Sequence, residues 1–371
     1  MRILVPRLAD ASQINAQNLN AKAILAHAGG RDVQWVVAHY GEPDVTLRNL
    51  AHVELAPLRQ GRLWPWHIGA MYQRSADAIF YPGAEWFDTA ALRLRSACGR
   101  SIPMIATMEG LPGDSAREHE AAIVSGHTVH CHRVNARILN RIDSIFTRAA
   151  HIVAISPFLG RIASYLYGTK VSVLPFGYDE RAFHARGRRS PRRSRVVCAA
   201  GLRSHKRPEV FVALAEAFPD ADFIWYGAGD PGSIPGLNPH RRQKNLSFPG
   251  AVTQQQLAEA MRNADILVLP SLSEGVPKIT MEAAACGLAQ IVFGHYEAPT
   301  VAEGRNGHVV WTDEELKTKL GGLLSNGALR RKMGDSGIEM ARDWTWSRLA
   351  PMWQDHITRL VREAKRGNLR R

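Results

Sequence analysis

The sequence contains no uninterrupted apolar run that approaches the roughly 20 residues needed by a membrane-spanning helix. It has only 4 cysteines among 371 residues, and none of them stands in a Cys-x-x-Cys pair. A disulfide scaffold and a structural zinc site are therefore not expected, and a reducing compartment fits. The first apolar run ends at Pro6, which is too short for the core of a signal peptide. We expect a soluble, cytoplasmic protein; peripheral association with the inner face of a membrane stays open.

The arginine-rich stretches also lack interleaved aromatic residues of the kind found in grooves for single-stranded nucleic acid. Its net charge is +13, and much of the excess lies in an arginine-rich segment at residues 186–195 and in the tail from Arg359. Nucleic acid, an anionic membrane surface, a phosphorylated substrate or a solvated linker and tail would each account for this charge. We predict no nucleic-acid partner, and a nucleic-acid binder with steeply salt-dependent affinity stays as an alternative.

Short β-branched runs alternate with amphipathic stretches along most of the chain, a pattern typical of parallel α/β sheets. The polar segment 185–194 has no apolar period and is the predicted linker between two such sheets. The predicted strands are residues 2–5, 33–38, 78–81, 104–107, 152–155, 171–175, 196–200, 222–226, 266–269 and 290–293, with helices at 208–217, 254–262 and 279–286 among others. Two α/β domains in tandem are expected to form a cleft where the carboxyl ends of their strands meet.

The segment from residue 265 to 292, DILVLPSLSEGVPKITMEAAACGLAQIV, is the most informative part of the sequence. A buried strand ends at Pro270, a turn of small residues follows, and a helix is predicted to begin at Pro277. Proline suits a first helical position because the N–H it lacks has no partner within the helix. The free N–H groups of the first turn, with Lys278 beside them, predict an anion site.

Two glutamates flank this anion site. Glu274 precedes the predicted helix, and Glu282 lies on it with seven residues between the two. A helix rises about 1.5 Å per residue, so the two carboxylates would reach different parts of one ligand. A nucleotide sugar needs such an arrangement, with a positively charged site for its diphosphate and a carboxylate on each side to accept hydrogen bonds from its hydroxyl groups.

The stretch SEGVPKITMEAAACG resembles the E-x7-E segment of the family-4 retaining glycosyltransferases. The resemblance implies an α/β protein of the GT-B fold, in which two Rossmann-like domains face each other across a cleft. It also implies that Glu274 contacts the donor sugar and Glu282 the ribose hydroxyls, with Gly275, Val276, Pro277 and Lys278 completing the donor loop. No metal and no cofactor are implied, because the nucleotide sugar is a substrate.

Other segments match the same family in the expected order. AAGLRSHKRPEVFVALAEAF resembles the segment in which an arginine and a lysine grip the diphosphate. Lys206 falls on the lysine position, but the arginine position is Gly201, and Arg203 stands two residues later. Fixed cations here would stabilise the charge that the leaving diphosphate gains. The segment KVSVLPFGYDERAF resembles the crossover into the second domain, with Phe176 where asparagine is usual.

The first half departs further from the family. Members often carry a histidine after the strand that ends in the cleft, whereas IATMEGLPGD places Glu109 there. Glu109 would accept the proton of the acceptor or bind a sugar hydroxyl, and a capping or structural carboxylate is an equal alternative.

Two motifs look like metal sites. His127, His130 and Cys131 lie close in sequence, but no carboxylate is fixed beside them and few of them would share a helix face. Asp220 and Asp222 form a D-x-D that precedes a strand instead of following one, so a helix-to-strand turn is predicted. No metal site is expected from either.

The predicted function is transfer of a hexose from a UDP- or GDP-linked donor to an acceptor hydroxyl, retaining and metal-independent, in polysaccharide, lipopolysaccharide or other glycoconjugate synthesis. Residues 1–184 would bind the acceptor, which is unknown, with a membrane-associated or lipid-linked molecule among the candidates. Residues 196–350 would bind the donor, and a helix in 351–371 would cross back to the first domain. A nucleotide-sugar 2-epimerase-type isomerase of the same fold and a non-catalytic nucleotide-sugar binder are the alternatives.

Overall fold

The computed structural model describes residues 1–8, 16–30, 32–39, 42–57, 76–82, 102–110, 136–185, 193–234 and 243–366. The chain divides into two compact units. The first contains residues 1–126, 132–176 and 346–371, and the second contains residues 127–131 and 177–345. Most of the predicted linker, and the cluster of His127, His130 and Cys131, lie outside the described residues.

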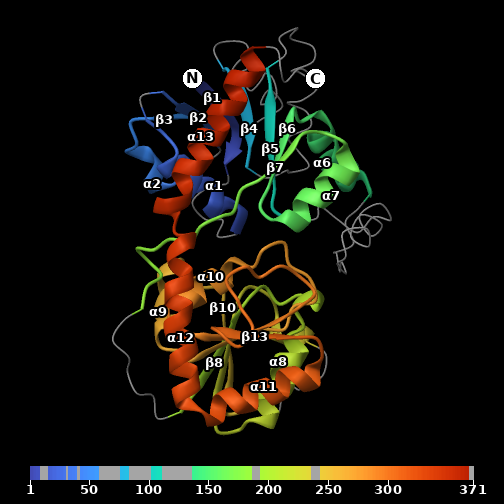
Figure 1. The fold of residues 1–371 in the computed structure, drawn as a ribbon, viewed down its shortest axis with the longest axis vertical. Coiled ribbons are helices and arrows are strands. Elements are labelled where there is room, and N and C mark those ends of the chain that lie inside the picture. Colours follow the sequence, from blue (N-terminus) through green and yellow to red (C-terminus); the bar gives the residue numbers. More distant parts are fainter. Residues whose placement is uncertain are drawn as a thin grey trace. The chain divides into compact units, whose positions relative to one another are not determined.

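The first unit is built on one parallel sheet with the strand order β3-β2-β1-β4-β5-β6-β7 (Figure 1). Its first six strands follow the order 3-2-1-4-5-6 of dinucleotide-binding folds. The strands are β1 (Arg2–Leu8), β2 (Gln34–His39), β3 (Val53–Pro57), β4 (Ala78–Tyr81), β5 (Met104–Met108), β6 (His151–Ala154) and β7 (Val171–Val173). The helices described in this unit are α1 (Ala16–His27), α2 (Val45–Arg48), α6 (Ala136–Arg148), α7 (Pro157–Tyr167) and α13 (Trp346–Lys365).

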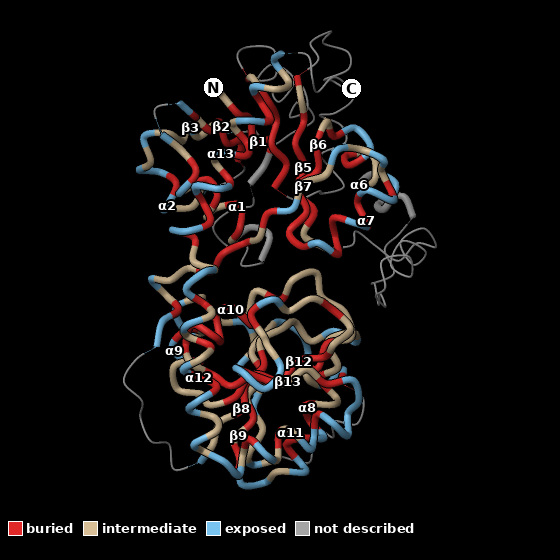
Figure 2. The backbone as a smooth tube through the Cα atoms, viewed as in Figure 1, coloured by how far each residue is buried: buried red, intermediate tan, exposed pale blue. Residues whose placement is uncertain are grey.

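The central strands of this sheet are buried on both faces. All four residues of β4 and all five of β5 are buried, as the red segments of Figure 2 show. Continuous apolar runs of this kind are what a parallel sheet covered by helices requires. The helix α7 has matching local signals, with Ser156 as its N-cap, Pro157 in its first turn and Gly168 (φ 54°) ending it in the left-handed region.

The last helix, α13, belongs to the first unit although it follows the second in sequence. The indole Nε1 of Trp353 donates a 2.8 Å hydrogen bond to the carbonyl oxygen of Pro175. The ring of Phe176 stacks on that of Trp353 with centroids 5.3 Å apart. Phe176 is therefore a packing residue in a position where an asparagine is usual in the resembled family.

The second unit repeats the same plan in six parallel strands, ordered β10-β9-β8-β11-β12-β13. This is again the order 3-2-1-4-5-6. The strands are β8 (Arg195–Ala199), β9 (Asp222–Tyr226), β10 (Leu246–Gly250), β11 (Ile266–Leu269), β12 (Ala289–Phe293) and β13 (Gly307–Val310). The helices are α8 (Pro208–Ala217), α9 (Gln254–Arg262), α10 (Lys278–Ala285), α11 (Asp313–Ser325) and α12 (Gly327–Ala341).

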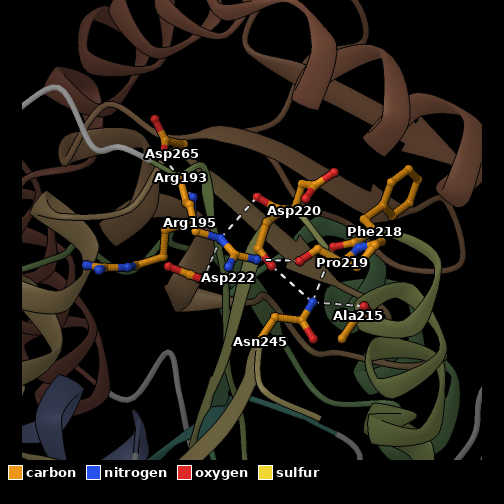
Figure 3. Close-up of polar contacts among 10 residues, drawn as sticks. Arg193, Arg195, Ala215, Phe218, Pro219, Asp220, Asp222, Asn245 and Asp265 are labelled. Atoms are coloured by element: carbon orange, nitrogen blue, oxygen red, sulfur yellow. Dashed lines mark hydrogen bonds and ion pairs between the residues drawn. The ribbon is translucent and has the colours of Figure 1, made fainter.

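The amino ends of these strands are joined by polar contacts at one edge of the sheet (Figure 3). Arg193 forms an ion pair with Asp222 at 3.3 Å, and the backbone N–H of Arg195 donates to the Asp265 carboxylate at 2.9 Å. The Asn245 amide donates to the carbonyl oxygen of Ala215 in the last turn of α8, and to those of Phe218 and Ala221 between α8 and β9. The predicted helix-to-strand turn at the D-x-D motif is confirmed, since Asp220 lies in the turn and Asp222 begins β9.

Within the described residues, the chain passes between the units at two points in sequence, after Phe176 and after Thr345. Within the second unit these two points lie side by side. The backbone N–H of Tyr178 donates a 2.9 Å hydrogen bond to the carbonyl oxygen of Trp344, and Tyr178 forms a parallel bridge with Thr345.

Candidate active site

The loops that follow β8 and β9 meet at the carboxyl edge of the second sheet. The N–H of Leu202 donates to the carbonyl oxygen of Ala228 at 2.8 Å. A Cβ at Gly227 (φ 152°) would lie 1.9 Å from the carbonyl oxygen of Ala200, so only glycine allows this approach. The glycine turn thus brings the Arg203–Lys206 loop onto the end of β9.

The loops after β8 and β11 are also joined, and here two predicted site residues meet. The N–H of Leu272 donates to the carbonyl oxygen of His205 at 2.9 Å. The adjacent Lys206 Nζ donates to Glu274 Oε1 at 2.5 Å, with side-chain exposures of 16% and 13%. The structure therefore places Lys206 and Glu274, which are 68 residues apart in sequence, in one partly buried ion pair.

Arg207, which follows Lys206, has an unusual backbone conformation. Its φ of 54° and ψ of 53° lie in the left-handed region, and no other non-glycine residue of the described chain has a positive φ. Its guanidinium pairs with the Asp313 carboxylate and lies 5.2 Å from the centroid of the Phe293 ring. Strained backbone of this kind persists where the surroundings hold it, and it is frequent beside functional groups.

Arg203 is exposed and begins the short 3-10 turn that ends at Lys206. Its Nε lies 3.6 Å from the point where a Cβ of Gly201 would stand. The side chain of Arg203 therefore folds back over the position that carries arginine in the resembled family.

The helix α10 begins at Lys278, and no side chain caps its amino end. Pro277, predicted as the first helical residue, is instead the N-cap, because its ψ of 99° is extended and not helical; the helix begins one residue later. Gly275 and Val276 are partly buried in the loop before it, and Val276 packs on the apolar cluster under α10. The N–H groups of the first turn and the Lys278 ammonium give this end of the helix a positive potential.

Glu282 lies one turn after Lys278 on α10 and is only 5% exposed. The pKa of its carboxyl is raised to about 7: burial is the main cause, the charge of Lys278 opposes it, and the charge of Asp179 adds to it. A carboxyl group in this state exchanges a proton near neutral pH.

Glu109 lies in the first unit, directly after β5. It is partly buried, and its Oε2 accepts a 3.2 Å hydrogen bond from the Asn20 amide of α1. The contact joins residues 89 apart in sequence. The structure thus brings Arg203, Lys206 and Glu274 to one edge of the second sheet, and places Glu109 in the other unit.

Two residues of this arrangement, Asn20 and Arg207, were not predicted from the sequence. Asn20 has no local signal, because its partner is remote in sequence. Arg207 has one, since it precedes Pro208, and the residue before a proline is biased away from the right-handed helical region.

Within the residues that the structure describes, no three His, Cys, Asp or Glu side chains are grouped so as to hold a metal ion. The same residues include no helix with the length and apolar character needed to traverse a lipid bilayer.

Comparison with known proteins shows what the chain resembles. Residues 193–326 match the family model described as glycosyl transferases group 1. The chain is 26% identical over 233 residues to the alpha-galactosylglucosyldiacylglycerol synthase of Streptococcus pneumoniae, a match that covers 58% of this chain. The chain spans about 62% of the length of that relative.

Solved structures show the same fold over nearly the whole chain. Sucrose-phosphate synthase from Thermosynechococcus elongatus superposes with a TM-score of 0.72 at 18% identity, covering 97% of this chain and 98% of the other. The Anabaena protein HepE in complex with UDP-glucose gives a TM-score of 0.73 at 14% identity, covering 96% and 99%. The predicted fold of two Rossmann-like domains, and the resemblance that suggested it, are confirmed.

Proposed function

We propose that this chain, which has the GT-B fold and carries a domain of the glycosyl transferases group 1, transfers a hexose from a nucleotide diphosphate sugar to an acceptor hydroxyl. The proposal includes retention of anomeric configuration and independence from metal ions. The observation that carries it is the meeting of Lys206 and Glu274 at the carboxyl edge of the second sheet, beside the uncapped amino end of α10.

The chemistry follows from the charges at this edge. The bond between the anomeric carbon and the diphosphate oxygen breaks, and its electron pair stays on the diphosphate. Lys206, Arg203, Lys278 and the N–H groups of α10 stabilise the charge that develops there, in place of a metal ion. The acceptor oxygen forms the new bond on the same face of the sugar, and its O–H bond breaks as the proton passes to the departing diphosphate oxygen or to Glu109.

Glu274 and Glu282 accept hydrogen bonds from donor hydroxyls in this proposal. Glu274 orients the sugar, and Glu282 accepts from the ribose. A uridine nucleotide is the first donor to test, because HepE, of similar fold, is described in complex with UDP-glucose. A GDP-linked sugar is the second.

The acceptor is proposed to be a hydroxyl on a lipid-linked or membrane-associated molecule. The name of the pneumococcal relative describes synthesis of a glycosylated diacylglycerol, which supports this class. Glu109, held by Asn20, would bind an acceptor hydroxyl or take its proton. Peripheral attachment to the inner face of a membrane belongs to the same proposal.

A thermal-shift screen against UDP-, GDP- and ADP-sugars tests the donor. A ligand at about 100 times its dissociation constant is expected to stabilise the protein by about 2.7 kcal/mol. Glu282→Ala is then expected to weaken donor binding, and Glu274→Ala to lower turnover more than donor affinity. Unchanged kinetics in both variants would refute the assignment.

Glu109→Gln tests the acceptor role independently of donor binding, and this variant is expected to leave donor affinity intact. A loss of donor affinity in this variant would mean that Glu109 serves another ligand. Release of free nucleotide without any acceptor would favour the isomerase alternative.

A further inference from the structure

The ion pair of Lys206 and Glu274 joins two groups that the proposed function assigns to different parts of the donor. Lys206 serves the diphosphate, and Glu274 serves the sugar. In the structure the two side chains are 2.5 Å apart and both are largely buried, with exposures of 16% and 13%. Among the described residues, Lys206 is the one cation within ion-pair distance of the Glu274 carboxylate.

The backbone holds this pair in place. The Leu272 N–H to His205 carbonyl bond ties together the two loops that carry the charged residues. Directly after Lys206, Arg207 is anchored by Asp313 and by the Phe293 ring. The pair is thus a contact between two fixed loops. A ligand that binds one of the two charged groups must therefore also provide a polar partner for the other.

A free nucleoside diphosphate compensates only one of the two charges. It offers phosphate oxygens to Lys206 but no donor to Glu274, and the carboxylate would be left without its partner beside a second anion. Separating a partly buried pair in this way is costly, because the remaining charge is poorly solvated. A nucleotide sugar also brings hydroxyl groups, which donate to the carboxylate and replace the lysine.

We propose that the Lys206–Glu274 ion pair makes the site discriminate between the nucleotide sugar and the free nucleoside diphosphate. The pair opens for a ligand that satisfies both residues. It closes again when the sugar has been transferred, and it thereby promotes release of the diphosphate product. This inference rests on the proposed function of the site.

The direct test is calorimetric titration in buffer with EDTA, using UDP and UDP-glucose, and then GDP and GDP-mannose as a second pair. Glu274→Gln removes the charge with little change in shape. We expect the variant to bind the free diphosphate about fivefold more tightly than the wild type does, because Lys206 no longer has a competing partner. The nucleotide sugar should gain nothing or bind more weakly, so the ratio of the two dissociation constants falls.

Two control variants bracket this result. Glu274→Asp keeps the carboxylate and should retain the wild-type preference for the nucleotide sugar. Glu303→Gln removes a carboxylate that pairs with Lys319 elsewhere in the same unit, and should leave both dissociation constants unchanged.

A double-mutant cycle separates release of Lys206 from simple relief of repulsion between Glu274 and the diphosphate. In a Lys206→Met background the lysine cannot be released, so Glu274→Gln should no longer tighten binding of the free diphosphate. An equal gain in both backgrounds would overturn the inference, as would a single variant that binds the free diphosphate no more tightly than the wild type.

Failure of the proposed function gives a different result. In that case the wild type would bind neither ligand of either pair, and the inference would fall with it. Binding of both ligands by the wild type, with no shift in Glu274→Gln, would overturn the ion-pair inference alone.

Discussion

At the scale of single residues, Glu282 places a proton equilibrium inside the proposed donor site. The pKa of its carboxyl is raised from 4.5 to about 7, mainly by burial. Ribose hydroxyls would donate to the ionised form, so donor binding favours loss of the proton. Folding stability in the absence of donor has the opposite pH dependence. The raised pKa contributes stability that is full below about pH 4.5 and is lost as the pH rises through about 7.

We therefore expect donor affinity to increase as the pH rises from 6 to 8 and to level off above the pKa. Below it the change should approach about tenfold per pH unit, as for one proton released on binding. Titration of the nucleotide sugar at several pH values measures this, and Glu282→Gln should bind weakly with a flat profile. A flat profile in the wild type would contradict the ribose role.

Arg207 offers a stability prediction at the same scale. Its left-handed backbone, at φ 54°, costs about 1–2 kcal/mol in any residue with a Cβ. Arg207→Ala and Arg207→Gly lose the same contacts with Asp313 and Phe293, and only the glycine relieves the strain. Glycine also adds freedom to the unfolded chain, which offsets about 0.4–1 kcal/mol.

We expect Arg207→Gly to be more stable than Arg207→Ala by about 0.5–1 kcal/mol, measured by urea denaturation. The exposed Arg161 on α7, changed to the same two residues, is the control, and there alanine should be the more stable. Equal stabilities of the two Arg207 variants would mean that the strain is absent in solution.

At the scale of elements, the sequence predicts the second unit more closely than the first. The predicted bounds of α8, β9, α9 and β11 agree with the structure residue for residue. These segments have sharp local signals, such as Pro208 at the start of α8 and the Thr253–Gln256 capping box of α9. The strands β3, β10 and β13 were not predicted, because all three are edge strands with mixed burial and weak apolar patterns.

The sequence predicted residues of the candidate site within single segments, but not the contacts between remote segments. The E-x7-E segment gave Glu274 and Glu282 because both lie within fifteen residues of continuous sequence around α10. Contacts between remote segments, such as Lys206 with Glu274 and Asn20 with Glu109, depend on how the loops meet. No local pattern encodes that meeting.

Another such remote contact ties α13 to the first sheet through a chain of hydrogen bonds. The Arg359 guanidinium, which can only donate, lies 2.7 Å from His356 Nδ1. Neutral His356 then donates from Nε2 to Ser172 Oγ at 2.7 Å, and the hydroxyl donates to His151 Nε2 at 2.9 Å. Both histidines are thus neutral, and every hydrogen bond of the chain is donated in the same direction, from Arg359 towards His151.

Burial lowers the pKa of His151 to about 4, with the charges of His356, Lys170 and Arg359 acting in the same direction. Burial also lowers the pKa of His356, as does Arg359, whereas Glu363 raises it. Both histidines have depressed pKa values in the folded protein. Their contribution to stability is full above about 6.5 and is lost as the pH falls towards 4.

Between pH 7 and pH 5 the two histidines lower stability against urea, whereas Glu282 acts with the opposite sign, so the prediction is a difference between variants. We expect His151→Phe to gain stability relative to the wild type as the pH falls from 7 to 5. At pH 7.5, Ser172→Ala should cost about 1–3 kcal/mol, because it leaves two buried imidazole nitrogens without their partner. Ser164→Ala, on the exposed face of α7, is the matched control and should change stability little. A Ser172→Ala variant as stable as this control would show that the hydrogen-bond chain contributes nothing.

At the scale of the whole molecule, the first unit depends on a helix that comes after the second unit in sequence. Five large apolar side chains of α13 are at most 3% exposed, namely Trp346, Trp353, Ile357, Leu360 and Val361. Removal of one such side chain costs about 2–5 kcal/mol, and a whole domain is stable by only about 5–15 kcal/mol.

Truncation after Thr345 should therefore abolish cooperative folding of the first unit and spare the second, which keeps its own core. Calorimetry with limited proteolysis checks this, and the expected result is one remaining transition and a protected fragment that begins near residue 177. Truncation after Arg366 leaves α13 complete and should preserve both units. Survival of the first unit without α13 would contradict its place in that core.

The dependence on α13 also bears on the order of events during translation. Domains usually fold from the amino terminus onwards as the chain leaves the ribosome. Here residues 177–345 emerge complete before α13 does, so the nascent second unit can fold while the first still exposes the surface that α13 will cover. The part of the protein made first is the part finished last, and until then its uncovered apolar surface is a target for chaperones.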